Sequence, residues 1–237
     1  STLCWVEALD KGDPKVKVDF RDEVFQLDAS FSGTPRSLVK TVNRYAGITW
    51  GNDEYAILHD QWWNTRNQKM YVFNPSDNTR EPRILVDRNY QNVYDDPGFP
   101  QTAKNAMGTY TLQMDGNSIY FFGDGFTAEG QFPFIDELDL KTLKKKRIYQ
   151  SAYTDKVEEL ITFVDSKKGV VITRIESPTE YPNYYIRNIR NKRLPVPLTT
   201  FENPFKSIEK VYKKVINYTR EDGVELTATL YLPAGYH

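Results

Sequence analysis

Cysteine and histidine are scarce in this sequence. Cys4 is the only cysteine among 237 residues, so no internal disulfide can form, and a small secreted domain held together by disulfides is excluded. The two histidines, His59 and His237, lie far apart and give none of the ligand spacings of a zinc site. Acidic pairs such as Asp95-Asp96 lack the residue order of a calcium loop. We therefore expect no metal site and no cofactor.

Long apolar runs and a dominant charge are also absent. No run approaches the ~20 apolar residues that span a bilayer, and the first residues show no basic region followed by an apolar core. The 31 basic and 32 acidic residues leave a formal net charge of −1, which does not favour nucleic acid or an anionic membrane surface as a partner. The compartment stays unknown, since a periplasmic, secreted or plastid location would fit equally well.

The parts of a hydrolytic active site are missing as well. The sequence contains no G-x-S-x-G, the motif that presents a nucleophilic serine on a sharp turn. A Ser-His-Asp triad also needs a histidine as general base. His237 is the final residue, and His59 ends an apolar strand, where we expect it to bond to Asp60 or to the backbone. No catalytic residue is therefore assigned.

Aromatic residues are abundant and lie in a repeating pattern. The 16 Tyr, 13 Phe and 4 Trp suit half-buried pleated surfaces and indicate an all-β fold. In each repeat an apolar strand, a polar turn and a second strand precede a longer connection, a third aromatic strand and a fourth strand. The first strands begin near Gly47, Thr109 and Leu160, a period of roughly 50 to 60 residues that is typical of four-stranded antiparallel propeller blades. The expected strands are 47–50, 55–59, 70–73 and 83–87, then 109–114, 119–122, 134–140 and 147–149, then 160–164, 170–175, 184–189 and 194–198.

The pattern predicts a partial β-propeller of about three and a half blades over residues 1–204. Residues 1–43 form an incomplete blade, and the complete blades occupy about 44–100, 101–153 and 154–204. Propellers close with roughly four to eight blades, so both ends of this array keep an open face. We expect that the chain is part of a larger propeller and that, in isolation, it self-associates through these faces.

Residues 205–237 read as a connector followed by a terminal hairpin. The segment 206–215 fits a helix by its apolar spacing and a strand by its β-branched residues. Glu221-Asp222-Gly223 supplies a turn, and residues 224–232 then alternate between apolar and polar side chains as a half-buried strand does. No further sheet follows in the sequence, so we expect this hairpin to be the first part of another domain.

Several stretches resemble one known family. "DGVELTATLYLPAGY" at 222–236 is similar to the first strand of the α/β-hydrolase domain in the prolyl oligopeptidase family of serine peptidases. "WVEALDKGDPKVKV" at 5–18, "RYAGITW" at 44–50 and "PRILVDRNYQNVYDDPG" at 82–98 are similar to propeller segments of its glutamyl endopeptidase branch. The resemblance implies a propeller segment that runs into the hydrolase domain of a peptidase. That peptidase would cleave after Glu by Ser-His-Asp acyl transfer in a downstream domain.

In that family the propeller covers the catalytic domain and helps to admit and hold peptides. The partners implied are a peptide substrate and the hydrolase domain. An acidic side chain is best held by Arg, whose fork pairs both carboxylate oxygens. Arg66, beside Trp62-Trp63, and Arg88 and Tyr94, on the loop between two blades, are therefore the candidate substrate-binding residues. Surface or inter-blade ion pairing is the alternative role of each arginine.

Two other functions fit the same sequence. The parent could be a dipeptidyl or acylaminoacyl peptidase of the same family, because propeller blades look alike across its branches. The chain could also be a stand-alone propeller that serves as an interaction scaffold. A G-x-S-x-G downstream of His237 would favour a peptidase, and a stop codon there would favour the scaffold.

Overall fold

Strands make up nearly all the regular structure of the chain. The computed structural model describes residues 2–191, 193–208 and 210–236. Over these ranges the helical segments are two short 3₁₀ turns, η1 (Val93–Asp95) and η2 (Lys206–Ile208). In this described part, no helix is long and apolar enough to cross a membrane.

The first two sheets are consecutive antiparallel meanders. A three-stranded sheet contains β1 (Thr2–Ala8), β2 (Asp22–Asp28) and β3 (Arg36–Thr41). A four-stranded sheet follows with β4 (Arg44–Trp50), β5 (Ala56–Trp62), β6 (Asn67–Phe73) and β7 (Arg83–Asn89). All four strands expected between residues 47 and 87 are present in the expected order.

The third sheet has the same four-stranded order but an interrupted first strand. Its strands are β8 (Phe99–Pro100), β11 (Met114–Asp115), β12 (Ser118–Gly123), β15 (Phe134–Asp139) and β16 (Lys145–Gln150). Both β8 and β11 pair with β12, on the edge that β15 leaves free. Two small hairpins extend from this sheet: β9 (Thr102–Lys104) with β10 (Tyr110–Leu112), and β13 (Phe126–Thr127) with β14 (Gly130–Gln131).

The fourth sheet and a separate hairpin complete the chain. The sheet contains β17 (Val157–Asp165), β18 (Val170–Glu176), β19 (Asn183–Asn188) and β20 (Val196–Pro197). The connector contains η2 and leads to β21 (Tyr212–Thr219) and β22 (Glu225–Leu232). These two strands pair along their whole length, and Gly223 takes the positive φ of 86° that the turn requires.

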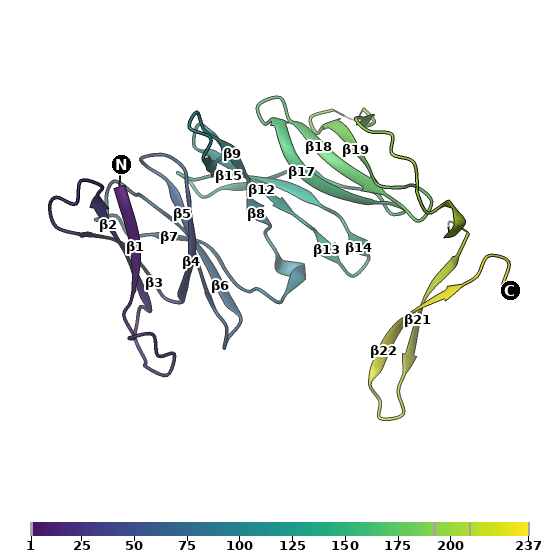
Figure 1. The fold of residues 1–237 in the computed structure, drawn as a ribbon, viewed down its shortest axis with the longest axis horizontal. Helices are drawn as coiled ribbons and strands as arrows, with labels where there is room; N and C mark the ends of the chain where they lie inside the picture. The colour runs from purple at the N-terminus through teal and green to yellow at the C-terminus, as the bar shows by residue number, and fades with distance from the viewer. Residues whose placement is uncertain (1, 192, 209, 237) are drawn as a thin grey trace.

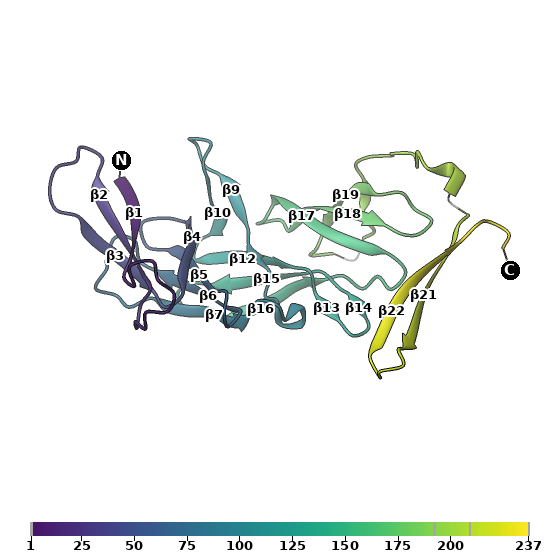
Figure 2. The same cartoon turned by 60° about the horizontal axis from the view of Figure 1, so that its bottom comes forward.

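The sheets are arranged as successive blades of a partial propeller. Figure 1 shows them side by side in chain order, with β21 and β22 standing apart from the blades at the C-terminal end. Figure 2 shows that they fan around a concave side. There the first strand of the second sheet, β4, lies nearer the concave side, and its fourth strand, β7, lies at the outside. The expected all-β, partial-propeller fold is confirmed.

The hydrophobic core lies between the blades. Each of three buried clusters draws its residues from two consecutive sheets, as expected for sheets that bury both faces against neighbours. In β5, Leu58 packs toward the first sheet and Ile57 toward the third. The clusters centre on Val24, Leu38, Leu58 and Tyr71, on Ile57, Val72, Ile119 and Leu140, and on Tyr120, Ile135, Phe163 and Val171.

Within the described ranges, the two outermost blades each leave one face without a neighbouring sheet. On the first sheet, the rings of Trp5 and Phe25 stack with centroids 5.6 Å apart, and Leu3 beside them is exposed. On the fourth sheet, Ile186 and its cross-strand partner Val196 are exposed. Self-association through these faces stays a prediction.

Candidate substrate-facing surface

The topology gathers one set of loops at a single edge of the blades. These loops connect β1 to β2 in the first sheet, the second and third strands of the other sheets, and the second, third and fourth sheets in succession. They lie along the lower edge in Figure 1, and the chain leaves β20 toward the terminal hairpin on this same edge. We call this edge the exit face. Its loops are residues 9–21, 63–66, 90–98, 124–133, 151–156 and 177–182.

Arg66 lies on the exit face in the turn between β5 and β6. Its backbone has a positive φ of 58°, a conformation that is uncommon for a residue with a side chain. The guanidinium lies 3.7 Å above the ring centroid of Trp63, and Nη1 donates a 2.6 Å hydrogen bond to the Trp63 carbonyl. Within the described ranges no carboxylate forms an ion pair with it, although its backbone carbonyl accepts from the amide of Tyr90. Arg66 is thus a cation held in a fixed position, and its remaining N–H groups can donate to a ligand.

Arg88 has a partner within the chain. Its Nη2 lies 2.7 Å from a carboxylate oxygen of Asp96, and its Nη1 donates to the Asn92 carbonyl at 2.9 Å. The side chain is only 10% exposed. These contacts hold the 90–98 loop against β7 and compensate the charge of Arg88. They fit the alternative role of Arg88 as an ion-pairing residue better than a contact with substrate.

Tyr94 is 66% exposed on η1 in the same loop. The three candidates therefore lie on one face of the molecule. The bond between Arg66 and Tyr90 joins the turn of Arg66 to the loop that carries Tyr94. Arg66 and Tyr94 are accessible to solvent, whereas Arg88 is largely buried and its hydrogen bonds hold the 90–98 loop in place.

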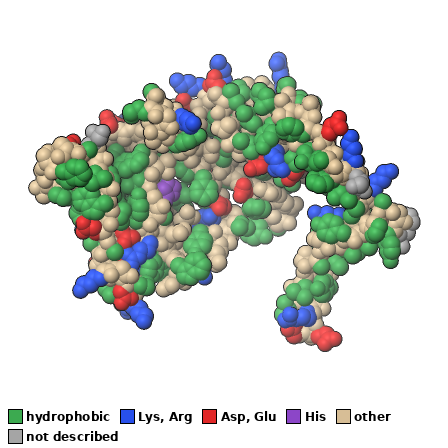
Figure 3. Space-filling model, viewed as in Figure 1, with side chains coloured by type: hydrophobic (Ala, Val, Ile, Leu, Met, Phe, Trp, Pro, Cys, Tyr) green, Lys and Arg blue, Asp and Glu red, His purple; other side chains and the backbone are tan. Residues whose placement is uncertain are grey.

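A cleft of about 820 Å³ opens at the exit-face loops 124–133, 151–156 and 177–182, between the blades and the terminal hairpin. Figure 3 shows the hairpin separated from the body of the molecule on this side. The size is within the range of ligand sites, roughly 300–1,000 Å³. The walls come from the β13–β14 hairpin, the start of β17, the connector and β22, and they include Phe132, Tyr153, Phe205, Ile208, Val211 and Tyr231. Sequence reasoning missed this cleft because its walls are far apart in the sequence.

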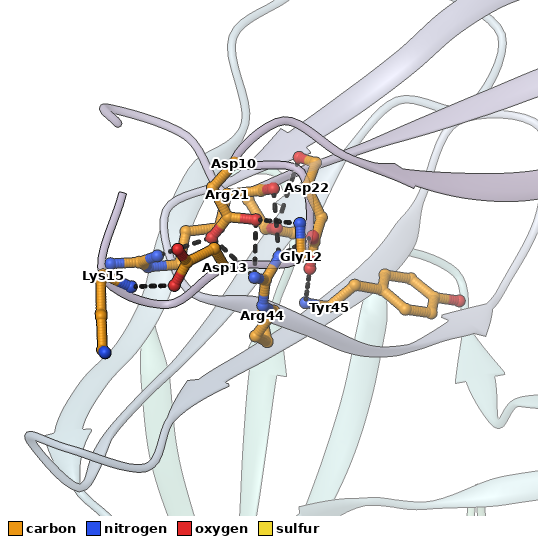
Figure 4. Close-up of polar contacts among 9 residues, drawn as sticks. Asp10, Gly12, Asp13, Lys15, Arg21, Asp22, Arg44 and Tyr45 are labelled. Carbon is orange, nitrogen blue, oxygen red and sulfur yellow. Dashed lines mark hydrogen bonds and ion pairs between the residues drawn. The ribbon is translucent and has the colours of Figure 1, made fainter. Parts of the chain in front are cut away.

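An ion-pair network fixes another exit-face loop, residues 9–21. Arg44 on β4 reaches both oxygens of the buried Asp10 at 2.6 Å and also pairs with Asp22 at 2.6 Å, while Arg21 approaches Asp10 at 2.7 Å (Figure 4). Burial acts to raise the pKa of Asp10, but the hydrogen bonds from Arg44 and Arg21 outweigh it and lower that pKa. The network joins the first blade to the second, and its charged groups are paired with one another.

His59 does not lie in a hydrolytic arrangement. It is on β5, and its Nε2 is 3.0 Å from the hydroxyl of Thr49 on β4. Of the two expected partners of His59, Asp60 or the backbone, Asp60 is wrong, because its carboxylate accepts hydrogen bonds from Asn43 and Tyr71. Successive side chains on a strand point to opposite faces, so His59 and Asp60 cannot meet. Burial lowers the pKa of His59 and favours its neutral form.

The chain is similar to known proteins in sequence and in fold. A probable glutamyl endopeptidase, chloroplastic, from Oryza sativa subsp. japonica is 39% identical over 249 residues, covering 99% of this chain and 26% of the relative. The protein of the same name from Arabidopsis thaliana is 35% identical over 252 residues, covering 100% of this chain and 26% of the relative. The chain resembles glutamyl endopeptidases along its whole length. It spans about a quarter of the length of these relatives.

One solved structure supports the fold from a greater distance. Oligopeptidase B from Trypanosoma brucei, with covalently bound antipain in a closed form, aligns with a TM-score of 0.50 and 12% identity. The alignment covers 100% of this chain and 32% of that chain. At this identity the match shows a shared fold alone. No family model matches the chain. The resemblance to the prolyl oligopeptidase family, and to its glutamyl endopeptidase branch, is confirmed.

Proposed function

We propose that this chain is the non-catalytic propeller segment of a serine peptidase that cleaves peptides after Glu. The single observation that carries the proposal is the 39% identity to a probable glutamyl endopeptidase over 99% of the chain. The sequence itself contains no G-x-S-x-G motif. Catalysis by acyl transfer therefore belongs to another part of the parent protein, and the propeller segment gates or contacts the peptide.

We further propose that the boundary between the two domains lies near residue 205. Residues 1–204 are the propeller segment, and the connector with β21 and β22 begins the α/β-hydrolase domain. Support comes from the exposure of every residue of β21, whose one strand partner among the described residues is β22. The face of the hairpin that carries Ile216, Leu226 and Leu232 would be covered by the remainder of the hydrolase domain. The exit face then looks toward that domain.

Within this arrangement, Arg66 contacts the acidic side chain of the substrate. Its stacking on Trp63 fixes the plane of the guanidinium, and the same ring excludes water from one side of it. A fixed guanidinium can pair both oxygens of a glutamate at once. Tyr94 offers an exposed ring and hydroxyl nearby on the same face.

Replacing Arg66 with alanine in the parent enzyme should selectively weaken the cleavage of peptides after Glu. A hydrogen bond to a charged group contributes about 1.5–3 kcal/mol, so kcat/KM for a Glu peptide should fall at least about tenfold, mainly through KM. Peptides with Ala at the cleaved position should lose little. Arg66→Lys should recover part of the loss, because a lysine keeps the charge without the fork.

The matched control is Arg80→Ala. Arg80 is exposed on the opposite edge of the same blade, where it pairs with Asp77 at 3.0 Å. This variant should leave both peptides unaffected. An equal loss on Glu and Ala peptides in Arg66→Ala would show that Arg66 does not read the acidic side chain.

A further inference from the structure

Another cleft lies on the edge of the blades opposite the exit face. It opens at the junction of the second and third sheets and has a volume of about 490 Å³, a size at which ligand sites are found. Its walls are the connections that join first to second strands and third to fourth strands in these two sheets. We call it the junction cleft. The exit-face loops and the terminal hairpin line no part of it.

Turns on both sides of the junction cleft are held in fixed conformations. In the turn between β4 and β5, the side chain of Asn52 accepts hydrogen bonds from the amides of Glu54 and Tyr55, both at 2.9 Å. In the turn between β15 and β16, the Asp139 carboxylate accepts from the amide of Thr142 at 2.7 Å. Because these walls are already ordered, a ligand does not have to order them on binding.

Arg83 joins the two sheets within the cleft. From β7, its Nη1 donates to the Lys141 carbonyl at 2.9 Å, and its Nη2 donates to the Leu140 carbonyl. Both acceptors precede β16, at the end of the third strand of the next sheet. These bonds tie the second sheet to the third, and the side chains of Arg83 and Lys141 come together in the lining of the cleft.

The positive charges of Arg83 and Lys141 have no acidic partner. Among the described residues neither side chain takes part in an ion pair, and the acceptors of Arg83 are neutral carbonyls. A guanidinium held in this way keeps its charge and further N–H groups, which can donate to a carboxylate. Arg80, the third cation of the lining, is paired with Asp77 at 3.0 Å.

Two acidic side chains, Glu54 and Glu81, line the same cleft. Within the described ranges neither of them forms an ion pair. A ligand with only a negative charge would face these two carboxylates, and a ligand with only a positive charge would face Arg83 and Lys141. A ligand that carries both an ammonium and a carboxylate group matches both sets.

The junction cleft also has an apolar side. Val72 and Phe73 on β6 line it and are only 2% and 5% exposed. Tyr55, which also lines the cleft, packs against the core cluster that contains Val72. An apolar group of a ligand that covers these residues would be removed from water, which favours binding.

We propose that the junction cleft binds a small zwitterion with an apolar side chain, either a free amino acid or a dipeptide. The carboxylate of the ligand pairs with Arg83 and Lys141. Its ammonium group pairs with Glu54 and Glu81, and its side chain covers the apolar side of the cleft. The site lies away from the exit face and does not rest on the proposed function.

Calorimetric titration of this chain at low ionic strength tests the two charges of the ligand separately. The probes are L-leucine, L-leucyl-L-leucine, N-acetyl-L-leucine, which lacks the ammonium group, and L-leucinamide, which lacks the carboxylate. Leucine or the dipeptide should bind at least about tenfold more tightly than either blocked derivative, because each derivative loses a charged contact. The tighter of the two zwitterions shows whether the ligand is an amino acid or a peptide.

Two variants assign the charges to residues. Lys141→Gln should weaken the binding of the zwitterion about tenfold and leave the binding of leucinamide unchanged. Glu54→Gln should weaken the binding of the zwitterion similarly and leave the binding of N-acetyl-leucine unchanged. Both side chains are exposed on turns, so the variants should fold, which circular dichroism checks.

Lys167→Gln and Asp53→Asn are the matched controls. Lys167 is an exposed lysine in the turn between β17 and β18, and Asp53 is the exposed neighbour of Glu54 in the same turn. Neither residue lines the junction cleft. Both controls should bind the zwitterion as the unchanged chain does.

Three results would overturn the proposal. The first is equal affinity for the zwitterions and the blocked derivatives, and the second is inorganic phosphate binding as tightly as leucine. The third is the lack of binding by both leucine and the dipeptide. A parent protein that cleaves no peptide would refute the proposed function and leave this inference standing, since the titration measures binding to this chain.

Discussion

Replacing Arg187 with alanine should lower the free energy of unfolding by about 3–5 kcal/mol, the cost of leaving a buried charge without its partner. The Glu158 side chain has no exposed surface, and Arg187 Nε donates to it at 2.9 Å while being only 13% exposed itself. The Tyr149 hydroxyl donates to the other carboxylate oxygen at 2.6 Å. Tyr149 lies on β16 and Glu158 on β17, so the charge sits at the junction of two blades.

Denaturant unfolding followed by circular dichroism measures this loss. Tyr153→Phe is the graded control, because it removes only the 2.9 Å bond from Arg187 Nη2 to the Tyr153 hydroxyl and should cost about 1 kcal/mol. The double variant Glu158→Gln with Arg187→Met should recover much of the loss, since it leaves no buried charge. A loss in Arg187→Ala no larger than that in Tyr153→Phe would contradict this account of the junction.

Gly98→Ala should be nearly as damaging, for reasons that lie in the backbone. Gly98 has a φ of 80°, and a Cβ placed there would collide with the backbone carbonyl of Phe122 on β12. A left-handed conformation costs a residue with a side chain about 1–2 kcal/mol, and forcing extra atoms into a packed site adds about 1–3 kcal/mol. The expected loss in the free energy of unfolding is therefore about 2–5 kcal/mol.

Gly116→Ala separates the two contributions. Gly116 has a φ of 63° in the turn before β12, and a Cβ there would meet no atom within 4 Å. It should therefore cost only the conformational part, about 1–2 kcal/mol. Equal losses in the two variants, measured by the same unfolding experiment, would show that the backbone at Gly98 moves aside without penalty.

The repeated strands could be predicted because their pattern is local. Alternating apolar residues mark each strand, and turn residues separate them, so the three four-stranded repeats were found in order. The connector at 206–215 carried two conflicting signals, and the structure divides it accordingly. The 3₁₀ turn η2 occupies Lys206–Ile208, and the strand β21 begins at Tyr212.

Features formed by segments that lie far apart in the sequence could not be predicted from local patterns. The run 109–114 has the pattern of a single strand. In the structure, a hydrogen bond from the Gln113 amide to the Gln101 carbonyl closes a hairpin at that point, and β11 begins one residue later. Phe99 and Pro100, expected in the preceding repeat, pair with β12 of the third sheet. The partner of Arg88 and the cleft near Tyr231 likewise depend on tertiary packing.

Arg66 shows the converse case, in which residue type and position sufficed to propose a site. The sequence placed an arginine beside two tryptophans on a connecting loop. The structure adds the stacking on Trp63 and, among the described residues, the lack of a carboxylate partner. Its role with substrate is a proposal.

Cleavage profiling of the parent protein tests the central claim most directly. The substrates are peptides that differ only at the cleaved position, with Glu, Pro or Ala, and the readout is kcat/KM for each. The account predicts that the Glu peptide is cleaved at least about tenfold faster than the other two, the discrimination that one charged contact can supply. A preference for Pro or Ala, or a protein that cleaves none of them, would contradict it.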